Sequence, residues 1–268
     1  MASLHSIAPS PVGAQIRMWR QRRRLSQLDL ALDANVSQRH LSFVESGRAS
    51  PSRDMVLHLA EALDVPLRER NALLLAAGFA PRYPERPLED PALAPARAMV
   101  EAVLRAHEPN PALAVDGRWT MLAVNAAVPR LLAGVRDPAL LAPPVNVLRL
   151  SLHADGLAPS IANLGEWRAH ILHRLKRQVQ VSGDAVLSDL LAELTALGGR
   201  GVGSGAPVTG EAIAVPLELD TPEGRLSLIS TTTMFGTPVE VTLSELAIEA
   251  FYPADAASAE RLRRLTPR

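Results

Sequence analysis

The fold of the amino-terminal part of the chain is decided by residues 25–47, LSQLDLALDANVSQRHLSFVESG. Ser26 and Ser37 each stand just before an apolar pattern of helical spacing, and a serine there caps the first free amides of a helix. Between the two patterns lies Asn35, which tolerates the left-handed backbone of a tight turn. Gly47 ends the second pattern. The stretch therefore predicts two short helices joined by a three-residue turn.

Further helices are predicted on both sides of this pair. One opens at Pro11 and carries Trp19 on its apolar face. Another runs from the cap Ser52 to Leu63, and a last one ends near Gly78. Five short helices with such a turn between the second and the third indicate an all-α helix-turn-helix domain.

Charge is distributed unevenly along the chain. The 268 residues hold 28 basic and 28 acidic groups, so that the formal net charge is zero. Residues 1–53 nevertheless carry eight arginines and three acids, a net charge of +5, and the remaining residues carry −5. A positive head on a negative body indicates that the head contacts an anionic partner.

The head contains the runs Leu25-Ser26-Gln27, Val36-Ser37-x-x-x-Leu41-Ser42-x-Val44-Glu45-x-Gly47, Pro51-Ser52 and Leu59-Ala60-x-Ala62-Leu63. In these runs it resembles the XRE (Cro and phage-repressor) family of DNA-binding domains over about residues 11–79. Asn35 replaces the glycine that is usual in the turn, and Phe43 stands where a polar residue is common. The resemblance implies that the third helix enters the major groove of duplex DNA.

Groove geometry assigns roles to single residues. Gln38 is suited to an adenine edge, Arg39 to a guanine and Phe43 to a thymine methyl group. The full set predicted to contact DNA, with bases or phosphates as targets, is Gln27, Ser37, Gln38, Arg39, Ser42, Phe43, Arg48 and Ser50. Arg22 to Arg24 would add attraction that is blind to sequence. The alternative is that these arginines are a solvated helix end on a plain helical bundle.

Composition limits where the protein works. The chain has no cysteine, which excludes disulfides, thiolate zinc sites and a cysteine nucleophile. No apolar run reaches the roughly 18 residues of a membrane span, and no secretory signal opens the sequence. We expect a soluble cytoplasmic protein without a membrane partner.

Two segments divide the chain. Residues 80–97 hold five prolines, which oppose a continuous helix, and are predicted as a linker. Residues 198–210 are rich in glycine and are predicted as a mobile loop. The glycines follow a helical pattern and precede a strand pattern, the reverse of a phosphate-binding loop.

The body is predicted to be an α+β domain with an antiparallel sheet. Residues 112–115 and 119–125 are typical of two strands around the Asp116-Gly117 turn. Helices are predicted over 99–106, 126–132, 146–153, 164–181 and 184–197, and further strands over 212–219, 225–235 and 246–252.

Several short runs in the body form a recognisable set: His107-Glu108-Pro109, Ala123-Val-Asn-Ala126, Val145-Asn-Val-Leu-Arg-Leu150, Asn163-Leu-x-Glu-Trp-Arg168 and Thr231 to Pro238. In these runs the body resembles the sensor domain of the MmyB-like transcription regulators over about residues 98–253. The resemblance implies a PAS-like fold of roughly five strands with an apolar cavity for a fatty-acid-like ligand. The predicted organisation is thus a helix-turn-helix domain (10–79), a linker (80–97), a ligand-sensing domain (98–253) and a C-terminal helix or tail (254–268).

Several residues are candidates for the ligand site. Asn146 and Arg149 share a face of one short helix, and a guanidinium suits a carboxylate. Trp167, Ile171 and Leu175 form an apolar stripe, while Asn125 and Phe235 each end a strand. The alternative is structural: Arg149 pairs with an acid, Asn146 caps its helix, and the stripe is core.

Catalysis and metal binding are not favoured. The chain has no HExxH or GxSxG motif. His170 and His173, with Glu166 four residues before His170, could ligate a metal, but two such histidines arise easily by chance and the sequence forces no third ligand. We therefore predict a homodimeric regulator of DNA operators that responds to a small effector, with no enzyme activity, metal or cofactor. The alternatives are an enzyme tethered to DNA, and a DNA-binding protein whose body serves only dimerisation.

Overall fold

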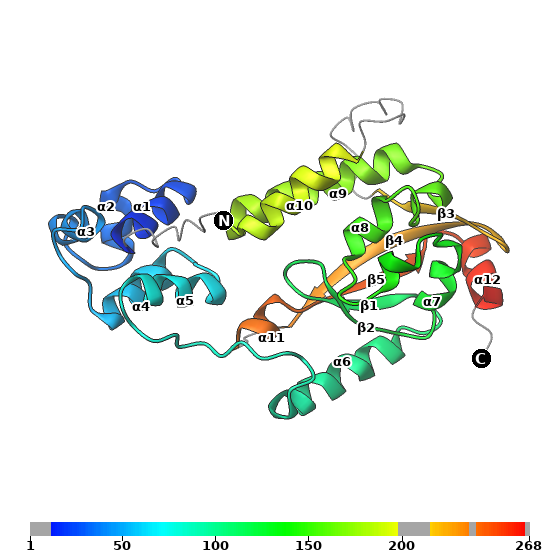
Figure 1. Cartoon of the computed structure of the whole chain (residues 1–268), viewed down its shortest axis with the longest axis horizontal. Coiled ribbons are helices and arrows are strands. Elements are labelled where there is room, and N and C mark those ends of the chain that lie inside the picture. Colours follow the sequence, from blue (N-terminus) through cyan, green and yellow to red (C-terminus); the bar gives the residue numbers. More distant parts are fainter. Residues whose placement is uncertain (1–11, 198–214, 236–239, 266–268) are drawn as a thin grey trace, which may run out of the picture. The chain divides into compact units, whose positions relative to one another are not determined.

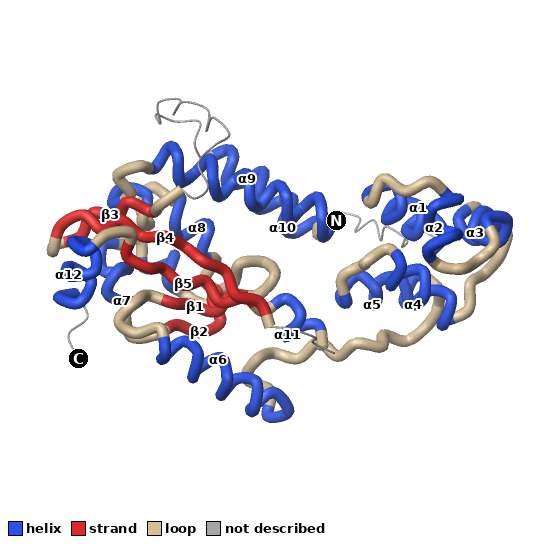
Figure 2. Tube along the Cα trace, turned by 180° about the vertical axis from the view of Figure 1, so that it is seen from behind, coloured by secondary structure: helices blue, strands red, loops and turns tan. Residues whose placement is uncertain are grey.

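The structure, a computed structural model, describes residues 12–197, 215–235 and 240–265. Two compact units make up the chain (Figures 1 and 2), with the first reaching Glu85 and the second beginning at Arg86. The division falls inside the predicted linker, residues 80–97. The glycine-rich segment 198–210 lies outside the described residues.

The first unit is helical, as predicted. Its helices are α1 (Val12–Arg22), α2 (Gln27–Asp33), α3 (Gln38–Glu45), α4 (Arg53–Ala62) and α5 (Leu67–Ala76). Three of them begin at serine caps: the hydroxyls of Ser26, Ser37 and Ser52 accept from the amide three residues on. At α2 the cap is reciprocal, because the Asp29 carboxylate accepts from the Ser26 amide at 2.8 Å.

The turn between α2 and α3 and the core beneath it fix the angle between the two helices. Asn35 takes the left-handed conformation with φ 48°. Trp19, Leu30 and Leu41 are at most 2% exposed and belong to one buried cluster that joins α1, α2 and α3. One face of α3 therefore packs on the core, and its opposite face is exposed to solvent.

The second unit is built on one five-stranded antiparallel sheet in the order β2-β1-β5-β4-β3. The strands are β1 (Ala112–Val115), β2 (Met121–Val124), β3 (Leu217–Thr221), β4 (Gly224–Met234) and β5 (Ala247–Pro253). Central β5 pairs with β1 through Ala250 opposite Ala112, and with β4 through Ala250 opposite Thr231. The predicted α+β class with an antiparallel sheet is confirmed.

Helices cover both faces of this sheet (Figures 1 and 2). The α-helices of the second unit are α6 (Ala94–Ala106), α7 (Val128–Leu131), α8 (Val147–Leu152), α9 (Leu164–Ser182), α10 (Ala185–Ala196), α11 (Val241–Glu245) and α12 (Ala256–Leu265). Short 3₁₀ helices lie at Pro91–Leu93, Leu132–Gly134, Pro138–Leu141 and Ala158–Ser160.

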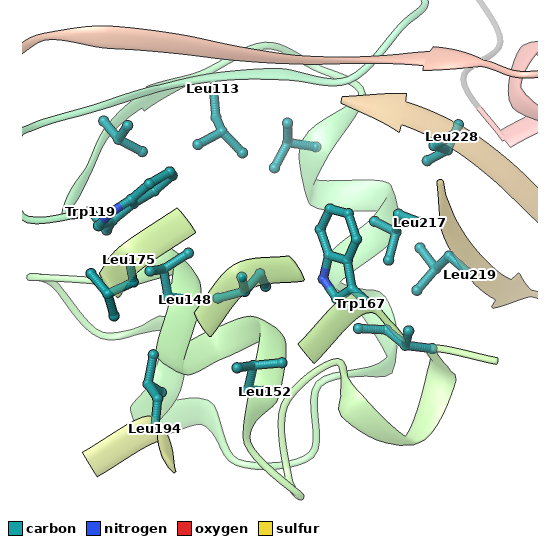
Figure 3. Packing of buried hydrophobic residues seen from close by; sticks show 14 of the residues in the cluster. Leu113, Trp119, Leu148, Leu152, Trp167, Leu175, Leu194, Leu217, Leu219 and Leu228 are labelled. Carbon is teal, nitrogen blue, oxygen red and sulfur yellow. The ribbon is translucent and has the colours of Figure 1, made fainter. Parts of the chain in front are cut away.

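Alternate residues of β1 face opposite layers. Leu113 and Val115 belong to the cluster that contains buried residues of α8, α9 and α10. Ala112 and Ala114 join Leu104 of α6 in a second cluster. Figure 3 shows the first cluster, with leucines of the strands facing leucines and Trp167 of the helices.

The structure differs from the sequence prediction at three element ends. Helix α6 begins at Ala94, inside the predicted linker, because Pro95 lies in its first turn, where a missing amide costs nothing. Strand β3 begins at Leu217, and residues 212–214 of the predicted strand are outside the described ranges. The C-terminal helix α12 is no loose tail, since Leu262 is 1% exposed in the main cluster.

The β1–β2 connection is also longer than a two-residue hairpin. The Asp116 carboxylate accepts from the amides of Arg118 at 2.9 Å and Thr120 at 2.7 Å. Trp119 is consequently held at φ 67°, a conformation that bulky residues rarely adopt. β2 therefore begins only at Met121, and the Trp119 ring turns toward the helices of the main cluster.

Candidate nucleic-acid interface and ligand cavity

The outward face of α3 is polar. Ser37, Gln38 and Arg39 are exposed at its N-terminal end, while Leu41 and Val44 are completely buried on the opposite face. All eight residues predicted to contact DNA are at least partly exposed: Gln27, Ser37, Gln38, Arg39, Ser42, Phe43, Arg48 and Ser50. The sequence prediction required this orientation.

Phe43 is the apolar centre of this face and is partly exposed. The guanidinium carbon of Arg39 lies 5.5 Å from its ring centroid, and that of Arg48 lies 6.0 Å away. Cations at these distances are attracted to the ring face. The two arginines therefore flank an apolar ring, and all three side chains are accessible from outside.

A buried ion pair ties α1 to α3. Arg20 of α1 donates to both carboxylate oxygens of Glu45, from Nε at 2.7 Å and Nη2 at 2.9 Å. The Glu45 side chain is 2% exposed. Burial alone would raise the pKa of Glu45, but hydrogen bonds from Arg20 and Gln27 outweigh it and hold that pKa below its ordinary value.

Gln27 takes part in this network, which the sequence did not reveal. Its amide nitrogen donates to Glu45 Oε2 at 2.8 Å. The side-chain amide has a second N–H, and the residue is partly exposed. Gln27 therefore joins the start of α2 to the end of α3, next to the face described above.

The arginine run 22–24 also has structural work. Arg23 donates from Nε to the carbonyl of Leu63 at 2.8 Å and from Nη2 to that of Asp64 at 2.6 Å, which satisfies carbonyls at the end of α4. Arg22 and Arg23 both lie over the ring of Trp19. The guanidinium of Arg23 thus forms hydrogen bonds within the domain itself.

The second unit contains a cavity between the sheet and the helices on one of its faces. Its lining is mostly apolar: Pro111, Leu113, Trp119, Met121, Val128, Leu131, Leu132, Val147, Leu148, Leu150, Leu157, Trp167, Ile171, Leu217, Leu219 and Phe251. Trp119 and Trp167 project into the layer between strands and helices (Figure 3). The polar lining side chains are Ser151, His170, Arg174, Ser230 and Glu249.

An ion pair spans two layers at this lining. Arg174 of α9 donates to both carboxylate oxygens of Glu249 on β5, from Nη1 at 3.0 Å and Nη2 at 2.6 Å. The Thr232 hydroxyl donates to Glu249 Oε1 at 2.8 Å. The Arg174 guanidinium also lies over the Trp119 ring, 4.5 Å from its centroid.

Comparison with family models decides the identity of both units. Residues 96–265 match the ligand-binding domain of MmyB-like transcription regulators, and residues 16–70 match a helix-turn-helix model. The chain belongs to the MmyB-like transcription regulators. No match to a curated protein was found. The predicted XRE-type head and MmyB-like body are therefore confirmed, and the chain is a DNA-binding transcription regulator with a ligand-binding domain.

Of the residues predicted for the ligand site of the MmyB-like domain, some line the cavity and others do not. Trp167 and Ile171 line the cavity. Leu175 belongs to the same stripe of α9 but is fully buried in the core beside it. Phe235 packs in the cluster that contains α6, away from the cavity lining.

The two predicted polar residues of α8 have the structural roles of the alternative interpretation. Asn146 caps the helix, because its side-chain oxygen accepts from the Arg149 amide at 3.0 Å. Arg149 forms a bidentate pair with Glu193 of α10, at 2.6 and 2.7 Å, and lies outside the cavity lining. The arginine that does reach the MmyB-like cavity is Arg174.

Asn125 has a structural role as well. It is 4% exposed and donates to the carbonyls of Leu104 at 3.2 Å and Asn110 at 2.8 Å. Its oxygen accepts from the amide of Ala112 at 3.2 Å. The residue thereby satisfies backbone groups where α6, β1 and the end of β2 meet.

The histidines of α9 do not assemble a metal site in the described part of the MmyB-like domain. His170 stacks on Trp167 with 5.5 Å between ring centroids. Across residues 12–197, 215–235 and 240–265 no group of three or more His, Asp or Glu is placed to hold a metal ion. Nor does any helix in these ranges have the length and hydropathy of a membrane span.

Proposed function

We propose that this chain is a one-component cytoplasmic regulator, in which an effector held in the cavity changes how the helix-turn-helix domain binds its operator. The observation that carries the proposal is that one chain combines an exposed polar face on α3 with an apolar cavity in a separate unit. Linkage requires only that the effector bind one of two DNA-binding states better than the other.

The proposed readout of DNA follows from the exposed face of α3. Gln38 bonds an adenine edge, Arg39 a guanine, and the Phe43 ring packs on a thymine methyl, with Ser42 as a weaker reader. Ser37, Arg48 and Ser50 hold phosphates, and Gln27 uses its second amide hydrogen in the same way. The protein binds as a homodimer on an inverted repeat, as helix-turn-helix domains of this kind do.

Single substitutions on α3 test this readout. Gln38→Ala and Arg39→Ala should each weaken binding to an operator selected from random DNA by about 1–3 kcal/mol, while non-specific binding changes far less. Fluorescence anisotropy on specific and random duplexes measures both. Arg82→Ala is the matched control, because Arg82 is also exposed but its amide is bonded to Asn71 of α5.

Two outcomes would contradict the proposed mode of binding. The first is that both variants of α3 bind the operator as tightly as the unmodified protein. The second concerns the dimer: light scattering of the protein on its operator that finds one chain per duplex excludes binding to an inverted repeat as two half-sites.

We further propose that the effector is a fatty-acid-like molecule and that the domain is PAS-like and without enzyme activity. The lining supports this, because an apolar chain fits sixteen apolar residues while few polar groups remain for a head group. A body that served only dimerisation would not need such a cavity. Native mass spectrometry of the purified protein should find a bound amphiphile or bind added decanoic acid; no binding of any amphiphile would refute the proposal.

A further inference from the structure

The two charged side chains of the cavity lining, Arg174 and Glu249, carry no net charge together. The Arg174 guanidinium and the Glu249 carboxylate neutralise one another through two hydrogen bonds. Glu249 is 4% exposed, so that its negative charge depends on this partner and on the Thr232 hydroxyl rather than on water. The ion pair is thus already complete before any ligand enters.

His170 does not change this balance. Burial lowers the pKa of His170, and the neighbouring Arg174 and His173 lower it further, against a smaller opposite effect of Glu249. His170 is therefore neutral at pH 7. The remaining polar side chains at the lining, Ser151 and Ser230, are uncharged hydroxyls.

An anionic head group would disturb this ion pair. A ligand carboxylate that bonded Arg174 would compete with Glu249 for the same guanidinium. The Arg174 side chain is 34% exposed, but the Glu249 side chain is only 6% exposed. A buried carboxylate that has to share its one cation with a second carboxylate does not stay ionised beside it. The arrangement of lowest free energy has one proton, taken from solvent, shared between the ligand carboxylate and Glu249.

We propose that the cavity takes its effector in electrically neutral form, so that a carboxylic acid binds together with one proton and an alcohol binds with none. The inference rests on the proposed function, that the cavity holds an amphiphile. It assigns Arg174 and Glu249 as the residues that determine which head group is accepted. An acidic effector would then bind more tightly as the pH falls.

The test uses the full-length protein and two ligands of equal chain length, decanoate and decanol. Each is titrated calorimetrically at pH 7.5 in phosphate and in Tris, two buffers whose heats of ionisation differ. The heat for decanoate should differ between the buffers by the amount expected for uptake of one proton, and the heat for decanol should not. Between pH 8 and 7 the affinity for decanoate should rise about tenfold and that for decanol should stay constant.

Matched variants locate the proton. Glu249→Gln keeps the size of the side chain but removes the carboxylate, so decanoate should bind it without proton uptake and with an affinity independent of pH. Glu193→Gln breaks a second bidentate Arg–Glu pair of this unit, outside the cavity lining, and should retain the uptake.

Three results would overturn the inference. Equal heats for decanoate in the two buffers would show that the unmodified protein binds the anion without a proton. Uptake that persists in Glu249→Gln places the proton elsewhere, for example on His170. If neither decanoate nor decanol binds, the proposed function itself fails. The buffer comparison uses only the unmodified protein, so it tests proton uptake even if Glu249→Gln does not fold.

Discussion

At the scale of residues, Glu45 unites three helices through one carboxylate. It accepts from Arg20 of α1 and from Gln27 of α2 while it belongs to α3. Glu45 is the last residue of α3 and is buried, whereas Gln38 and Arg39 at the start of the same helix are exposed. The position of the proposed DNA-reading residues therefore depends on a buried ion pair that contacts no DNA.

Glu45→Gln should destabilise the first unit by about 3–5 kcal/mol, because it leaves Arg20 buried opposite a neutral amide. The pH dependence follows from the lowered pKa of Glu45. A carboxylate with a lowered folded-state pKa gives stability that is present above its unfolded pKa and is lost as the pH falls through the folded value. The melting temperature should therefore fall more steeply between pH 7 and pH 3 in the unmodified protein than in the variant.

The exposed Glu61→Gln of α4 provides the control for this experiment and should leave both stability and its pH dependence almost unchanged. Equal stability of Glu45→Gln and the unmodified protein at pH 7 would show that the ion pair does not hold α3 in place.

At the scale of elements, sequence and structure agree best where local signals suffice. Both α2 and α3 begin at the residues that the serine caps predict, because a cap and the helix it starts lie within four residues. The strand order, in contrast, pairs β1 with β5 across more than 130 residues, which no local pattern specifies. The number and type of strands were predictable, but their partners were not.

The ligand site illustrates the same limit. Arg149 attracted attention because it shares a helical face with Asn146, a local relation. Arg174 reaches the cavity because α9 crosses the sheet at Glu249, 75 residues away in sequence. Trp167 and Ile171 were identified by their apolar stripe, which is visible in sequence even when its exact neighbour is not.

The Arg149–Glu193 pair joins α8 to α10 and should contribute little. Both side chains are about 40% exposed, and ion pairs so accessible to water contribute about 0–1 kcal/mol. Arg149→Ala should therefore lower stability by no more than that and leave the affinity for decanol unchanged, as urea unfolding and calorimetry would measure. A tenfold loss of ligand affinity would return Arg149 to the site.

At the scale of the whole molecule, the chain consists of two units with separate cores: one buried cluster in the first unit and two in the second. The sequence predicted both units and the linker between them from charge, proline content and periodicity. Coupling between a cavity and a DNA-reading helix is a property of states rather than of contacts in one state. It has to be measured as a difference in affinity.

The most direct measurement is the affinity of the full chain for its selected operator with and without saturating decanol, by fluorescence anisotropy at one salt concentration. We expect decanol to change the affinity for the operator by about 5–150-fold, the usual range for coupled sites. Identical operator affinity for the free protein and for protein that calorimetry shows to be fully occupied by decanol would contradict it.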